Sequence, residues 1–276
     1  MRDVRPAAVA GMFYPHAPAL LASEVDAFLE AVAPAAARVP KAIVVPHAGY
    51  VYSGSVAATA YARLAPARDR IARVVLLGPA HRVAVRGLAL PGATAFSTPL
   101  GAVDVDAEAV ELIRDLPQVV ESRLAHAQEH SLEVQLPFLQ RVLARFTLLP
   151  LVVGDASADE VAAVLDRLWG GPETLIVIST DLSHYHAYAD ARRRDRAAVQ
   201  DVLALAPTLD RDQACGATPL NGFLLCASRR GLVPELLDLR NSGDTAGDRS
   251  RVVGYAALAF AAPEGRGAPA RLAPDR

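Results

Sequence analysis

The stretch TLIVISTDLSHYH, residues 174–186, carries the clearest information about the fold. Its first five residues form a continuous apolar run, and such runs are typical of strands that are buried on both faces of a sheet. Four further runs of this kind occur along the chain, at residues 41–45, 72–77, 146–153 and 252–260. The sequence therefore predicts a central sheet that helices cover on both sides.

Helical patterns separate these strands. They cover residues 20–32, 55–64, 106–116, 131–143, 157–169, 190–205 and 217–230. Ser157 opens a capping-box signature, Asp106 can cap the segment after it, and Pro137 predicts a kink or a late helix start. The alternation of strand and helix predicts one α/β domain, residues 1–262, with a largely parallel or mixed central sheet, followed by a mobile tail at 263–276.

Composition excludes several classes of protein. The chain has 276 residues, of which 52% are hydrophobic and 21% charged, with a net charge of −2. This balance indicates a folded protein and offers no basic surface typical of nucleic-acid binding. The apolar runs are shorter than the roughly 18 residues that a membrane span needs, and the N-terminus lacks a clean signal peptide. Only two cysteines are present, so we expect a cytoplasmic protein without a disulfide framework.

Polar side chains follow three of the predicted strands. His47 and His81 come shortly after the first and second strands, and Asp181 and His184 follow the strand at 174–178. Ligands of open α/β sheets bind outside the carboxyl ends of the strands, so these side chains are expected at one shared site. Imidazoles from different strands can bind Zn, Fe or Cu, or move protons near neutral pH. The alternative for each histidine is a structural role in a loop or in the core.

Five other residues are candidates with open alternatives. Cys215 opens a helix, where backbone N–H groups favour the thiolate, so it is either a metal ligand or nucleophile or a buried small hydrophobe. His130, with Glu129 beside it, fits helix entry as well as a site role. Tyr50 and Tyr52 can form one wall of a pocket or cover the sheet edge. Three further histidines are expected in turns or loops outside the site: His16, His126 and His186.

Five blocks of the chain resemble the Memo family, whose bacterial and archaeal members are called AmmeMemoRadiSam system protein B. The blocks are PHAGYVYSG (46–54), GPAHR (78–82), EHSLEVQLPF (129–138), STDLSHYH (179–186) and CGATPLNGFLL (215–225). The resemblance extends in order over nearly the whole chain. It implies a fold like that of class III extradiol ring-cleaving dioxygenases, which are non-heme Fe(II) enzymes.

The resemblance also implies a set of metal ligands. His47 and His81 correspond to the two metal histidines, and Cys215 stands where the dioxygenases carry glutamate. A His/His/Cys set is softer than a set with a carboxylate, so Cu(I) and Zn join Fe(II), which is the first expectation.

The remaining site residues and the partners follow from the same resemblance. His184 matches the acid–base histidine of the dioxygenases, Asp181 is expected to orient it or to bind a second ion, and His130 with Glu129 would line the pocket. An AMMECR-type protein and a radical-SAM protein are implied as partners. The leading hypothesis is a cytoplasmic metal-binding protein, a candidate redox enzyme of unknown substrate. The alternatives are a non-catalytic module that binds a peptide or a partner, and a protein that handles iron or copper.

Overall fold

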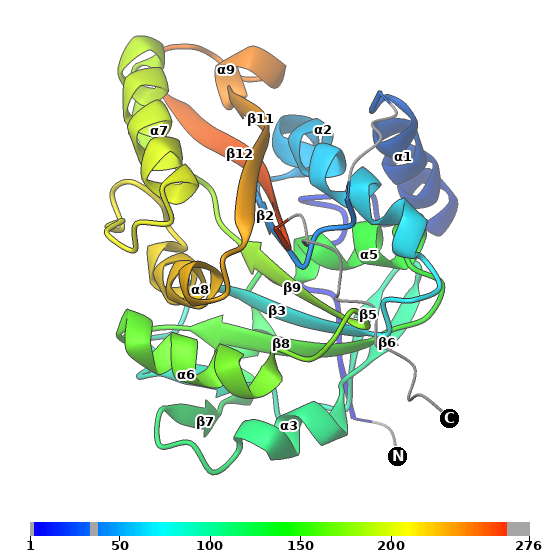
Figure 1. The fold of residues 1–276 in the computed structure, drawn as a ribbon. Coiled ribbons are helices and arrows are strands. Elements are labelled where there is room, and N and C mark those ends of the chain that lie inside the picture. The colour runs from blue at the N-terminus through cyan, green and yellow to red at the C-terminus, as the bar shows by residue number, and fades with distance from the viewer. Residues whose placement is uncertain (1–2, 34–37, 264–276) are drawn as a thin grey trace, which may run out of the picture.

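The computed structural model describes residues 3–33 and 38–263, so the predicted tail lies outside the described residues from position 264 onward. Four parallel strands form the centre of the main sheet (Figure 1). In spatial order they are β2 (Ala42–Val45), β9 (Thr174–Ser179), β3 (Arg73–Pro79) and β8 (Thr147–Val153). All four coincide with predicted apolar runs.

Antiparallel strands extend this sheet on both sides, which makes it a mixed sheet of nine strands within the described residues. At one edge lie β12 (Val252–Ala261), β11 (Val233–Asn241) and β10 (His184–His186). At the other lie β4 (Leu88–Leu90) and β7 (Val119–Glu121). A separate three-stranded sheet contains β1 (Val4–Arg5), β5 (Ala95–Thr98) and β6 (Gly101–Asp104).

Helices cover both faces of the main sheet, as the continuous apolar runs predict. Along β2, Ile43 and Val45 face one hydrophobic core, while Ala42 and Val44 face the other. The first core is closed by α1 (Pro18–Glu30), α2 (Tyr50–Tyr61) and α5 (Leu136–Val142). The second is closed by α3 (Ala107–Ile113), α6 (Ala158–Leu168), α7 (Tyr188–Leu203) and α8 (Ala217–Arg229).

The helix signals in the sequence have clear structural counterparts. Ser157 forms the predicted capping box, and the Asp106 carboxylate accepts a hydrogen bond from the third residue of α3. Pro137 lies in the first turn of α5, which therefore starts late, because proline lacks the N–H that an interior helical position needs. Shorter turns are η1 (Ala62–Ala67), α4 (Arg123–Ala127), η2 (Glu133–Gln135) and α9 (Ser242–Thr245). No helix of the described residues is both long and apolar enough to cross a bilayer.

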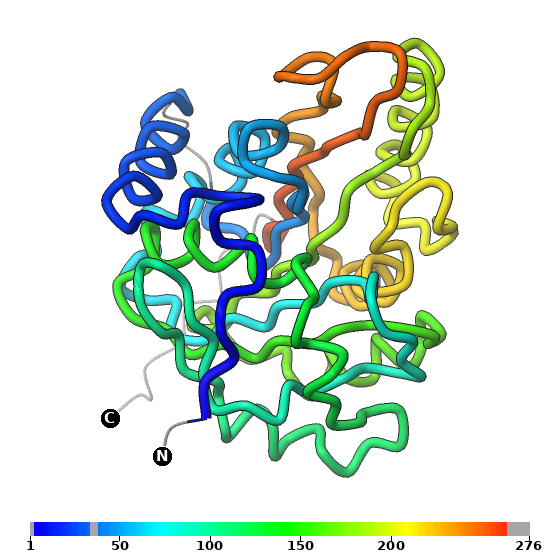
Figure 2. Tube along the Cα trace, turned by 180° about the vertical axis from the view of Figure 1, so that it is seen from behind, coloured from blue at the N-terminus to red at the C-terminus, as the bar shows by residue number. Residues whose placement is uncertain are grey.

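One buried carboxylate ties the N-terminal segment to the rest of the molecule. Glu133 is fully buried, pairs with Arg5 and accepts a hydrogen bond of 2.5 Å from Tyr14 Oη. It also accepts two backbone N–H groups of the same segment. Figure 2 shows this segment, in dark blue, running across the face of the molecule opposite to that in Figure 1. As a result Phe13 packs against the ring of His130, with 4.8 Å between the ring centroids.

Candidate metal centre

His47 is held at the end of β2 by the neighbouring strand β9. Its side chain is only 2% exposed, and its Nδ1 lies 2.8 Å from Ser179 Oγ, on the last residue of β9. Its backbone N–H donates to Asp181 Oδ1 at 2.7 Å. These two contacts fix the ring and leave Nε2 facing the interior of the site.

His81, which follows β3, is held by a buried carboxylate. Glu129 Oε2 accepts the backbone N–H of His81 at 2.7 Å, and Glu129 Oε1 lies 2.8 Å from His81 Nδ1. Oε1 also accepts the backbone N–H of Ser131 at 2.9 Å. Burial raises the pKa of Glu129, but the hydrogen bond and charge of His81 outweigh it and lower this pKa to about 2. An ionised carboxylate therefore orients His81 so that its Nε2 is free, an arrangement common behind metal-binding histidines.

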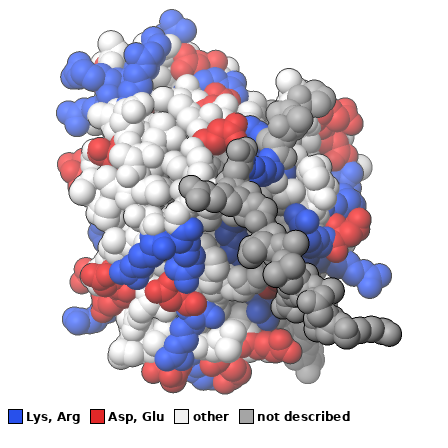
Figure 3. All heavy atoms as spheres, in the orientation of Figure 1, with Lys and Arg blue, Asp and Glu red and all other residues white. Residues whose placement is uncertain are grey.

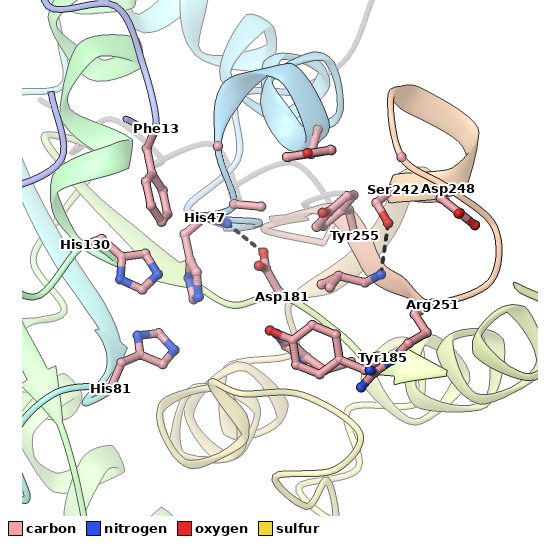
Figure 4. Close-up of a pocket in the computed structure, with 16 residues that line it drawn as sticks. Phe13, His47, His81, His130, Asp181, Tyr185, Ser242, Asp248, Arg251 and Tyr255 are labelled. Atoms are coloured by element: carbon pink, nitrogen blue, oxygen red, sulfur yellow. Dashed lines mark hydrogen bonds between the residues drawn. The ribbon is translucent and has the colours of Figure 1, made fainter. Parts of the chain in front are cut away.

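His130 completes a group of three imidazoles. One ring nitrogen from each of His47, His81 and His130 lies within 4.8 Å of the others, and no other group of three such ligands occurs among the described residues. Figure 4 shows the three rings turned toward one another. The rings of His81 and His130 are stacked, with centroids 4.6 Å apart.

His47 and His130 are poor proton acceptors. Burial, followed by repulsion from His81, lowers the pKa of His47 well below the usual value and that of His130 to about 4. Both rings are therefore neutral at pH 7, and neutral imidazole is the form that binds a metal ion. Because these imidazoles are neutral, they suit a transition-metal ion.

Cys215 lies directly beside this group without belonging to it. Its Sγ is 3.3 Å from His47 Nε2, and it accepts the backbone N–H of Asp181 at 3.3 Å. Burial and the nearby Asp181 carboxylate raise the pKa of Cys215 to about 12. Burial and Asp181 thus outweigh the backbone N–H groups of Asp181 and Gly216, whose hydrogen bonds lower this pKa. A bound metal would restore the thiolate.

Asp181 and His184 both line the site, but they do not act as a pair in this structure. Among the described residues, the Asp181 carboxylate accepts hydrogen bonds from the backbone at His47 and Ala48, and none joins it to His184. Burial raises the pKa of Asp181 to about 7 against the lowering effect of these contacts. Burial also lowers the pKa of His184, which lies on β10. Asp181 thus positions the loop that carries His47.

A cavity of about 600 Å³ opens from the three histidines toward solvent (Figure 4). Aromatic rings and one arginine surround its outer part; the residues concerned are Phe13, Tyr52, Tyr185, Tyr255 and Arg251. Sequence reasoning found only Tyr52 among them. The others come from the N-terminal turn, from β10, from β12 and, for Arg251, from the position directly before β12, where no strand end predicted a site residue. Tyr185 has a positive φ of 62°, an uncommon backbone conformation for a bulky residue, at a β-bulge beside His184.

The structure corrects the predicted role of three residues. Tyr50 does not line this cavity, because its ring packs in the core and its Oη donates to Val134 O at 2.7 Å. Helix α2 starts at Tyr50, so Tyr52 points away from it and into the cavity. Glu129 lies behind His81 and is not a wall of the cavity. His126 is not a loop residue: it is buried in α4, with Nε2 2.8 Å from Ala89 O.

The chain is similar to known proteins over most of its length. The family model described as Memo-like protein matches residues 5–259. A MEMO1 family protein of Aquifex aeolicus is 38% identical over 273 residues, covering 93% of this chain and 99% of the relative. One of Methanopyrus kandleri is 36% identical, covering 93% and 98%. An uncharacterized protein from Escherichia coli K12 superposes with a TM-score of 0.49 at 14% identity, over 80% of this chain and 100% of the other. The chain belongs to the Memo family.

Proposed function

We propose that this protein binds one transition metal ion through His47, His81 and Cys215. The observation that carries the proposal is the 3.3 Å contact between Cys215 Sγ and His47 Nε2, the nitrogen that Ser179 leaves free. A nitrogen and a sulfur bound to one tetrahedral ion at about 2.0 and 2.3 Å lie roughly 3.5 Å apart. The sulfur and the nitrogen thus already have the separation that a shared ion requires.

His130 is the alternative third ligand. One of its ring nitrogens lies within 4.8 Å of a ring nitrogen of His47 and of His81, so three imidazoles are also an available set. Its ring also stacks on His81 with an interplanar angle of 18°. We assign His130 to a position beside the ion, where it borders the cavity and limits which molecules can reach the ion.

The donor set supports Fe(II) as the first candidate, with Cu(I) and Zn(II) as alternatives, because two imidazoles and a thiolate suit all three ions. A bound ion would supply Lewis-acid or redox chemistry at its open position. The protein's own residues have other roles. His184 borders the cavity and can take or give a proton, Glu129 fixes His81, and the aromatic rings of the cavity exclude water. We propose a cytoplasmic redox enzyme of this type.

Metal analysis of four variants tests the proposal. Protein purified without oxygen or chelator is analysed for metal content, then challenged with Fe(II), Cu(I) and Zn(II). We expect His81→Gln and Cys215→Ser to lose affinity strongly, and His130→Gln to retain stoichiometric metal. Tyr52→Phe is the matched control, since it changes a cavity residue that lies outside the donor set. Full metal loading of Cys215→Ser together with loss of metal in His130→Gln would show that the third ligand is His130 and not the Cys215 thiolate.

Association with an AMMECR-type protein and a radical-SAM protein stays a prediction that rests on the family resemblance alone. Co-purification of the tagged chain from its native host, before and after removal of metal, is the direct test. Recovery of neither protein under both conditions would contradict it.

A further inference from the structure

A second cavity reaches the same centre from another side. It has a volume of about 520 Å³, and Cys215 lines it, whereas Cys215 does not line the aromatic cavity. His81 and His184 line both cavities and therefore stand between them. The centre has two approaches, one along aromatic side chains and one along Cys215.

The second cavity is lined mainly by basic side chains. Arg194 comes from α7, Arg211 from the turn before α8, and His186 from β10. Within the described part of the chain, neither arginine has an ion-pair partner. Asp212 is the one acidic residue on the wall, so it offsets a single positive charge.

The surroundings strengthen this positive charge. Four arginines, at 192, 193, 194 and 196, occur within residues 190–196 of α7 against two acids, Asp190 and Asp195, of which Asp190 pairs with Arg193, so this stretch keeps an excess of positive charge. Figure 3 shows the basic side chains gathered over the upper end of this helix. A concave surface lined by one sign of charge concentrates ligands of the opposite sign. The cavity wall and the helix beside it therefore favour a negatively charged ligand.

We propose that this second cavity binds a small carboxylate or phosphate ligand and presents it to the Cys215 side of the centre. The guanidinium groups of Arg194 and Arg211 are suited to this task because each can hold an oxyanion through two parallel hydrogen bonds. The inference rests on the proposed metal centre in one respect: the cavity sets the charge of the molecule that approaches the ion. The binding of the anion itself requires only the two arginines.

Alkylation of Cys215 measures this preference without any metal. The full chain is treated with chelator and reacted at pH 9 with iodoacetate, an anion, or with neutral iodoacetamide, and modification of Cys215 is located by peptide fragmentation. Both reagents attack the same thiolate, so the ratio of their rates reports the local charge and not the thiol's pKa. We expect Arg194→Gln and Arg211→Gln each to lower the ratio about threefold, as the Coulomb attraction of unit charges roughly 7 Å apart in water gives. The double variant should lower it about tenfold by the same reasoning.

Arg193→Gln is the matched control, because it removes a charge from the same helix outside the cavity wall. Inorganic phosphate and malonate are then compared as protectants against iodoacetamide, and the better one identifies the class of anion. A ratio that is the same in the double variant and in Arg193→Gln would overturn the proposal. Anion preference in a chain that binds no metal would support this cavity and refute the metal centre, so the two failures are distinguishable.

Discussion

Glu129→Gln should separate the metal affinity of the centre from its overall shape, because glutamine has the size of glutamate and only part of its hydrogen bonding. Glu129 accepts three hydrogen bonds through its two oxygens: His81 N–H at Oε2, and Ser131 N–H with His81 Nδ1 at Oε1. If the amide nitrogen takes the place of either oxygen, one backbone N–H faces a donor and is left unpaired. An unpaired buried donor costs about 1 to 3 kcal/mol, and the loss of charge weakens the other contacts by about 1 kcal/mol more.

In the orientation that puts the amide nitrogen at the position of Oε1, the same substitution also changes which nitrogen of His81 carries its proton. With Glu129 ionised, the proton stays on Nδ1 and Nε2 keeps its lone pair for a metal. An amide NH₂ at Oε1 would donate to Nδ1 and move the proton to Nε2, which can then no longer bind. We expect metal affinity to fall about 10- to 100-fold, the usual effect of losing such a supporting group.

Competition with a chelator measures the affinity, urea unfolding of the metal-free chain measures the stability, and nitrogen NMR shifts of His81 report its tautomer. Asp106→Asn is the control, since it removes a buried carboxylate at the start of α3, outside the centre. Affinity of Glu129→Gln within a factor of two of the natural chain, with the His81 proton still on Nδ1, would refute the reasoning.

Three further changes test the fold around the site. Although burial raises the pKa of Asp106, the hydrogen bond from Arg73 and the helix cap lower it overall. The stabilisation that ionised Asp106 gives the fold is therefore present above its unfolded pKa near 4, and it is lost as the pH falls through its lower folded pKa. We expect the urea midpoint of the natural chain to fall more steeply below about pH 4 than that of Asp106→Asn. Gly216→Ala would bring a methyl group to 2.7 Å from Thr180 Cβ, so we expect a loss of about 1 to 3 kcal/mol in urea unfolding together with weaker metal loading. Tyr50→Phe should cost about 1 to 2 kcal/mol on urea unfolding, because it leaves a buried carbonyl unpaired, and an unchanged midpoint would contradict its core role.

The central sheet was predictable because its strands are buried on both faces and so appear as unbroken apolar runs. β11 was missed for the opposite reason: most of VPELLDLRN is only partly buried or exposed, and it carries charges, which suits the outer strand of the sheet and resembles a loop in sequence. His47 and His81 were found because they follow predicted strands. His130 was placed only as a pocket residue because it precedes a short turn, and no periodicity indicates where such a side chain points.

The charges around the centre connect the identity of the metal with that of the third ligand. Glu129 is ionised and buried beside His81, and it places one negative charge next to the ion. If Cys215 binds as a thiolate, it adds a second negative charge. With the buried Asp181 carboxyl protonated, a divalent ion such as Fe(II) or Zn(II) then leaves the buried group neutral. Cu(I) with the same ligands leaves one uncompensated buried charge, which is costly. Cu(I) is instead matched by three neutral imidazoles and a protonated Cys215. We therefore expect a divalent ion if His47, His81 and Cys215 are the ligands, and Cu(I) if His130 replaces the thiolate.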